Sequence, residues 1–82
     1  MATATARENA GFKITGSFRT HTYADGRTEE IVFGERGVSI ERDPTPYVTW
    51  LCIGGDSYAW GHYFRVKGDA VDDFQKRVAR GF

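Results

Sequence analysis

The sequence predicts an α+β fold, a five-stranded antiparallel meander sheet followed by one C-terminal helix packed on one face. The first observation is a series of turn signals at Asp25-Gly26, Glu35-Arg36, residues 43–46 and Gly54-Gly55. When the chain is folded at each of them, the apolar residues of every segment fall on the same face, and a one-residue slip would reverse that face. The second observation is that helical periodicity follows Gly68.

The strands are recognised by alternation of apolar and polar residues between these turns. Phe12, Ile14 and Phe18 alternate with polar residues in the first long segment, as in a half-buried strand. Asp25-Gly26 is typical of a type I′ hairpin turn, and the prolines at 44 and 46 exclude a central strand there. Strands are therefore expected over residues 12–23, 28–33, 38–42, 47–53 and 57–66.

The turn lengths set an expected register for the whole sheet. Phe18 is placed opposite Phe33, Phe33 opposite Val38, Val38 opposite Leu51, and Leu51 opposite Tyr58. This register predicts that one face collects most of the apolar side chains: Phe12, Ile14, Phe18, Ile31, Phe33, Val38, Ile40, Leu51, Ile53, Tyr58, Trp60 and Phe64.

The C-terminal helix is expected over residues 69–80. Asp69 is a suitable N-cap, and Gly81 is suited to the left-handed residue that ends many helices. Positions i, i+3 and i+7 form one apolar stripe, so the helix covers one face of the sheet: Val71, Phe74 and Val78.

Composition limits the class of protein. The 82 residues suffice for one domain, expected over 10–82 after a disordered tail at 1–9. Eleven basic and eleven acidic residues cancel, which disfavours a protein devoted to gripping nucleic-acid phosphates. The single Cys52 cannot form an internal disulfide, which favours a cytoplasmic protein, and no apolar run indicates a signal peptide or membrane span.

The face away from the helix is predicted to remain uncovered, with Trp50 opposite Ala59 and Val48 opposite Gly61. Trp, Tyr and Arg commonly anchor interfaces, so this face is the candidate partner-binding surface. The alternative is that these side chains only stabilise the sheet through cross-strand packing. The candidate partner-binding residues are Trp50, Val48, Tyr63, Arg19, Val32 and Arg65.

Two other functions remain open. A sheet with exposed aromatic and basic residues can stack single-stranded bases, here with Trp50, Tyr63, Arg19, Arg65 and Lys13. In the same register a histidine and two glutamates form a row that suits acid–base catalysis, although a solvated charge row is the plainer interpretation. That row consists of His21, Glu30 and Glu41.

The leading expectation is a non-enzymatic protein-binding module that acts by occupying a partner's surface. Its partner is another protein or a second copy of the chain. Small proteins of this kind are common among phage and mobile-element inhibitors of host systems, including anti-CRISPR and anti-restriction proteins. No cofactor and no metal are expected, because one cysteine and two distant histidines, His21 and His62, give no zinc spacing.

Overall fold

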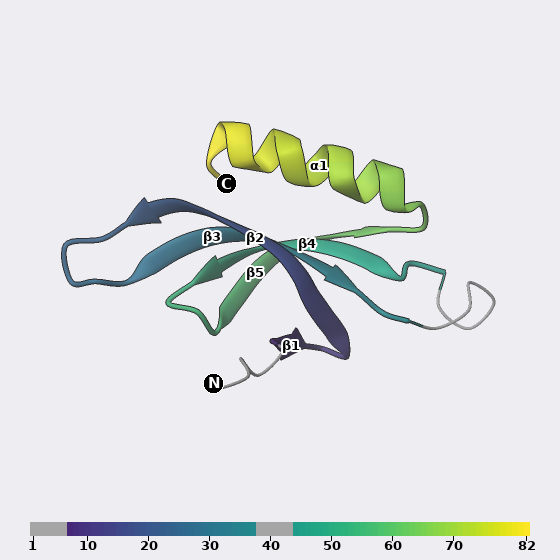
Figure 1. The fold of residues 1–82 in the computed structure, drawn as a ribbon, viewed down its shortest axis with the longest axis horizontal. Helices are drawn as coiled ribbons and strands as arrows, with labels where there is room; N and C mark the ends of the chain where they lie inside the picture. The colour runs from purple at the N-terminus through teal and green to yellow at the C-terminus, as the bar shows by residue number, and fades with distance from the viewer. Residues whose placement is uncertain (1–6, 38–43) are drawn as a thin grey trace, which may run out of the picture.

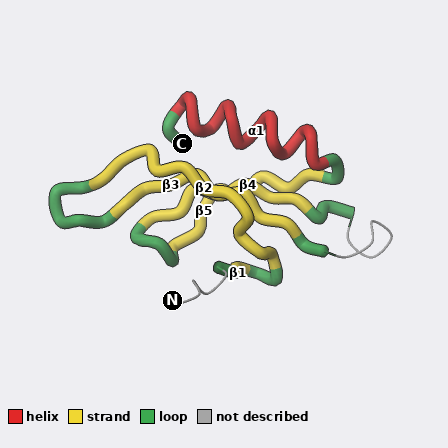
Figure 2. Tube along the Cα trace, in the orientation of Figure 1, coloured by secondary structure: helices red, strands yellow, loops and turns green. Residues whose placement is uncertain are grey.

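The computed structural model describes residues 7–37 and 44–82, and it confirms the α+β class. Five antiparallel strands form one curled sheet in the order β1-β2-β3-β4-β5, and a single C-terminal helix lies across one side (Figures 1 and 2). The elements are β1 (Glu8–Asn9), β2 (Phe12–Thr22), β3 (Thr28–Glu35), β4 (Tyr47–Ile53), β5 (Ser57–Phe64) and α1 (Lys67–Arg80).

The five strands are not the five expected ones. β3 pairs directly with β4, so that Ile31 lies opposite Leu51 and Phe33 opposite Thr49. The predicted placement of a 38–42 strand between them is therefore wrong, and residues 38–42 themselves lie outside the described part of the chain. The fifth strand is β1, formed by two residues that the sequence assigns to the tail.

The β2–β3 turn and two irregularities in β2 together change the predicted register of β2, and the irregularities bend the strand. Phe18 lies opposite Ile31 rather than Phe33, and Gly16 takes the place opposite Phe33. The pairing shifts between Ile14 and Gly16 and again between Arg19 and His21. An extra residue in one strand bends it and increases its twist, so β2 curls away from the plane of β3 and β4 (Figure 1).

The helix begins two residues before the predicted start at Asp69. Its first residue is Lys67, and the N-cap residue Val66 makes no side-chain capping bond, so the assignment of Asp69 as the cap is wrong. The Nζ of Lys67 lies 3.1 Å from a Glu35 carboxylate oxygen on β3, which ties this end to the sheet. Gly81 ends the helix as predicted, with φ of 92° and its N–H bonded to the Arg77 carbonyl.

The helix packs through a different stripe from the predicted one. Ala70 and Arg77 are buried, whereas Val71 is exposed. Phe74 does face the sheet, with its ring edge-on to Phe33 at 6.2 Å between centroids. The small Ala70 and the extended Arg77 stem permit this rotation. The helix-side core consists of Ile31, Phe33, Leu51, Ala70 and Phe74.

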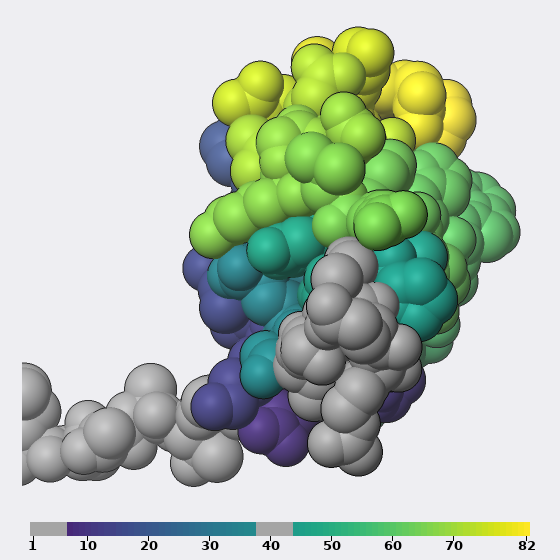
Figure 3. Space-filling view, turned by 90° about the vertical axis from the view of Figure 1, so that its right-hand side faces the viewer, coloured from purple at the N-terminus to yellow at the C-terminus, as the bar shows by residue number. Residues whose placement is uncertain are grey.

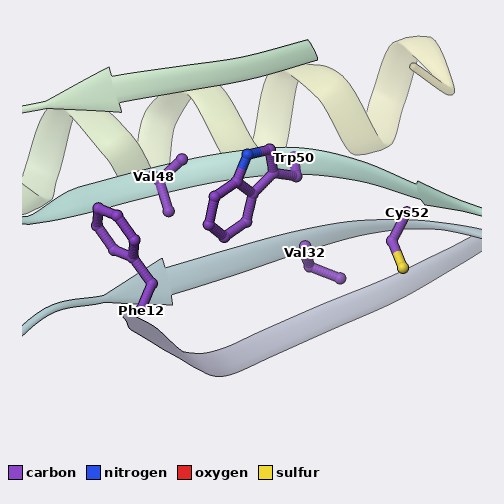
Figure 4. Close-up of a cluster of buried hydrophobic side chains, with 5 residues drawn as sticks. All are labelled: Phe12, Val32, Val48, Trp50 and Cys52. Atoms are coloured by element: carbon purple, nitrogen blue, oxygen red, sulfur yellow. The ribbon is translucent and has the colours of Figure 1, made fainter. Parts of the chain in front are cut away.

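A second core lies on the other side of the same sheet. There the N-terminal part of β2 curls over β3 and β4, and its Phe12 ring points toward Trp50 and Val48 (Figure 4). In Figure 3 the yellow-green helix and the purple N-terminal segment lie on opposite sides of the teal strands. We call this cluster the curl-side core: Phe12, Val32, Val48, Trp50 and Cys52.

Candidate functional site

The predicted uncovered surface around Trp50 is not uncovered. Trp50 lies on the face away from the helix, as expected, yet only 4% of it is exposed. The rings of Phe12 and Tyr58 approach it edge-on, each with 5.5 Å between centroids. Val32 and Val48 are fully buried beside it. The expectation that these three residues form an exposed contact surface is wrong, because the bulged β2 folds over the face that a flat sheet would leave open.

Glycines make room for the indole. A Cβ added to Gly61 would lie 2.8 Å from the Trp50 Nε1, and one added to Gly34 would lie 2.9 Å from the Val48 Cγ1. The predicted pairing of Trp50 with Ala59 and of Val48 with Gly61 is wrong. The β4–β5 hairpin already closes one residue away from the expected register, with Leu51 opposite Ala59, and an irregularity further along shifts the pairing again and brings Gly61 against Trp50.

The remaining candidate residues separate into two places. Tyr63 on β5 is 51% exposed, and Arg65 just beyond β5 is exposed. Arg19 is exposed on β2, and both β3 and β4 lie between its strand and β5 in the sheet order. The structure therefore keeps Tyr63 and Arg65 together and leaves Arg19 on another strand. Burial of Trp50 also removes the main ring of the proposed base-stacking platform.

The predicted row of His21 with two glutamates is not formed in its expected register. His21 lies opposite Glu29 and packs edge-on against Tyr23, while Glu30 lies opposite Arg19. The cause is the β2–β3 turn, which closes one residue away from the expected register, so that Thr22 lies opposite Thr28 and His21 opposite Glu29. Glu41 lies outside the described residues.

Glu30 instead takes part in a polar group at the N-terminal end of the chain. Arg7 contacts Glu30 at 3.3 Å and donates to the Tyr58 hydroxyl and the Cys52 sulfur, both at 3.4 Å. Burial raises the pKa of Cys52, and Glu30 adds to this, while Arg7 acts in the opposite direction. A thiol held protonated and fully buried is a poor nucleophile.

A polar junction, defined as Thr49, His62, Asp73 and Arg77, joins the helix to β4 and β5. The Thr49 hydroxyl donates to the Asp73 Oδ2 at 2.6 Å, and the His62 Nδ1 lies 3.0 Å from the same oxygen. The Arg77 Nη1 donates to the carbonyl and the hydroxyl of Thr49 at 3.2 and 3.1 Å. These bonds fix the helix to the sheet where a plain amphipathic helix would use apolar contacts alone.

Charge in the polar junction is balanced by these contacts. Burial by itself would raise the pKa of Asp73, but hydrogen bonds from Thr49 and His62 and the charges of His62 and Arg77 lower it below its ordinary value. Burial lowers the pKa of Arg77, and the charge of Asp73 opposes that shift. A carboxylate that orients a histidine is one half of an acid–base pair. The hydroxyl beside it, however, belongs to the fully buried Thr49 and is already donated to Asp73.

The arginine of the polar junction also holds Trp60 of β5. Arg77 is 1% exposed, and its Nη1 donates to the Trp60 carbonyl at 2.8 Å. Trp60 has φ of 52°, a left-handed conformation rare for a bulky residue, at the point where the β4–β5 register shifts. Its side chain is 64% exposed, although the sequence predicts it on the helix-covered face. Gly61 inside a strand is the sequence signal that could have indicated this bulge.

Two other classes of site are absent from the described part of the chain. Residues 7–37 and 44–82 contain no cluster of three or more His, Cys, Asp or Glu side chains arranged to hold a metal ion. Within the same residues, no helix has the length and apolar character needed to cross a membrane. Comparisons with known protein families, curated proteins and solved structures found no match to this chain.

Proposed function

We propose that this protein is a non-enzymatic protein-binding module whose contact is centred on Trp60 at the outer edge of β5. The observation that carries the proposal is that a tryptophan in a left-handed backbone conformation is fixed by a buried arginine and still presents 64% of its surface to solvent. Backbone outliers of this kind persist where the surrounding structure enforces them, and they gather at binding sites.

The cost of this arrangement argues against an accidental exposure. A left-handed conformation costs a non-glycine residue roughly 1–3 kcal/mol, whereas glycine adopts it freely. The Arg77 guanidinium is taken out of water, and its Nε has no hydrogen-bond partner among the described residues. The backbone strain and the desolvation of Arg77 both serve to hold Trp60 in place, and tryptophan is a residue type that anchors protein interfaces. Tyr63, 51% exposed on the same strand, enlarges the contact.

The proposed mode of action is occupation of a partner's surface without chemistry or a cofactor. The role of a phage or mobile-element inhibitor of a host system, acting in the cytoplasm, belongs to this proposal as its most specific form. A second copy of the chain is the other candidate partner.

The test is capture of partners by immobilised protein, followed by reconstitution with the purified partner. Trp60→Ala is expected to weaken binding at least about 30-fold, the effect of losing an interface anchor that contributes about 2 kcal/mol. The matched control is Phe18→Ala, because Phe18 is 54% exposed on β2, away from β5. Equal binding by the Trp60→Ala and parent proteins would refute the proposal, as would equal losses in both variants.

A further inference from the structure

β5 has a free edge within the described part of the chain. The sheet order ends at β5, and its one strand neighbour there is β4. After the bulge at Trp60 the strand is regular again, with His62 opposite Thr49 and Phe64 opposite Tyr47. The outer backbone groups of such a strand form a template to which another extended chain can add.

The side chains along this edge are aromatic and basic. Residues 57–66 contain one arginine, one histidine and no acidic residue. Arg65 is exposed and makes no ion pair with any other described residue, whereas His62 is already in contact with Asp73. Trp60 and Tyr63 supply exposed ring surface. An occupant that complements this edge carries carboxylates and apolar side chains.

We infer that the partner adds an extended acidic segment as a further strand beside residues 61–64, with a carboxylate against Arg65 and apolar side chains against Trp60 and Tyr63. This inference rests on the proposed protein-binding function and names the chemistry of the partner. Backbone pairing supplies affinity in such complexes, and the side-chain contacts supply selectivity.

The same charges argue against the other occupants. Two copies of β5 paired about residues 61–64 would offer neither Arg65 a carboxylate from residues 57–66 of the other chain. A nucleic-acid strand would suit the basic edge electrostatically, but it has no peptide backbone to fill the hydrogen-bonding positions of a strand edge. An acidic peptide segment is therefore the occupant that can both pair with the outer backbone groups of β5 and neutralise the charge of Arg65.

The experiment uses a displayed library of random twelve-residue peptides selected on the 82-residue chain, with counter-selection on its Trp60→Ala variant. Selected peptides are expected to carry net negative charge and alternating apolar residues. With a synthetic copy of the best peptide, amide hydrogen exchange within residues 61–64 should slow at least tenfold.

Arg65→Ser should weaken binding of this peptide about fivefold, and added salt should weaken it as well. Arg27→Ser, in the β2–β3 hairpin at the other end of the sheet, should leave it unchanged (Figure 1).

Several results would overturn the inference. These are selection of basic or uncharged peptides, no slowing of exchange in residues 61–64, or equal effects of the Arg65→Ser and Arg27→Ser changes. A dimer in light scattering that Trp60→Ala disrupts would assign the edge to a second copy. Salt-sensitive binding of single-stranded oligonucleotides lost in Trp60→Ala would assign it to nucleic acid. If a captured protein depends on Trp60 but leaves the 61–64 amides unprotected, only this inference fails, because the proposed function depends on Trp60 alone.

Discussion

Replacing Trp50 by alanine removes the largest side chain of the curl-side core. Only 4% of Trp50 is exposed, and its indole lies among three aromatic rings, those of Phe12, Tyr58 and Tyr63. Truncation of a buried tryptophan costs about 3–5 kcal/mol, including the cavity left behind. A domain of 82 residues has a free energy of unfolding of about 4–12 kcal/mol. The substitution therefore removes a large share of the total stability.

The measurement is thermal and urea unfolding followed by far-ultraviolet circular dichroism, which does not depend on tryptophan fluorescence. In a domain of this size, a loss of 1 kcal/mol lowers the Tm by about 4–8 °C, so Trp50→Ala should lower it by at least about 12 °C. Trp60→Ala provides the matched control, because it removes the same side chain from an exposed position. Its Tm should change by no more than about 3 °C.

The Trp50→Ala and Trp60→Ala variants distinguish a tryptophan needed for folding from one available for binding. A Trp50→Ala protein with the Tm of the parent would refute the assignment of Trp50 to a core and would restore it as a candidate contact residue. A Trp60→Ala protein that unfolds as readily as Trp50→Ala would show that the exposed ring is needed for folding.

Three further predictions follow from local geometry. Trp60→Gly should leave the Tm unchanged or raise it while abolishing partner binding, because glycine adopts φ of 52° without strain; a lower Tm in thermal unfolding would contradict this. Gly34→Ala should cost about 1–3 kcal/mol in urea unfolding, because its Cβ would lie 2.9 Å from a Val48 methyl; unchanged stability would mean that Val48 shifts freely. The folded-state pKa of Asp73 is lowered, so its contribution to stability is present above the unfolded pKa of about 3.9 and is lost as pH falls through the folded value. Asp73→Asn should therefore lower the urea midpoint at pH 7 more than at pH 2, and equal losses at both pH values would show that the charge of Asp73 is not responsible.

Local signals in the sequence were sufficient for much of the fold. The Asp25-Gly26 and Gly54-Gly55 turns lie where the hairpins close, and all three of these glycines have positive φ. Asp25 does not have positive φ, so the hairpin is located correctly but its predicted type I′ turn is wrong. Gly81 ends the helix, and the helix covers the face that bears Phe33. Each of these features depends on backbone conformation or alternation within a few residues, which the sequence records directly.

The errors come from turn geometry, from inserted residues and from distant contacts. Both hairpins close one residue away from the expected register, with Thr22 opposite Thr28 and Ile53 opposite Ser57, and single-residue bulges then shift β2 and β5 further. Nothing in a regular alternation pattern marks where an extra residue is inserted. The alternation of side chains along β4 placed the Trp50 ring on the correct face of the sheet. It could not reveal that the ring is buried, because the burial results from the curl of β2 over that face. The burial of Arg77 has no local sequence signal, because it depends on carbonyls of Thr49 and Trp60 that lie far away in the sequence.

The burial of Cys52 beneath Arg7 gives the protein an intrinsic chemical reporter. The sulfur is inaccessible while Arg7 spans Glu30 and Tyr58, and the chain contains no other cysteine. A disulfide reagent such as dithionitrobenzoate can therefore react only after this end of the sheet opens. The labelling rate in native buffer measures how often that opening occurs, so the N-terminal segment can be followed without an introduced probe.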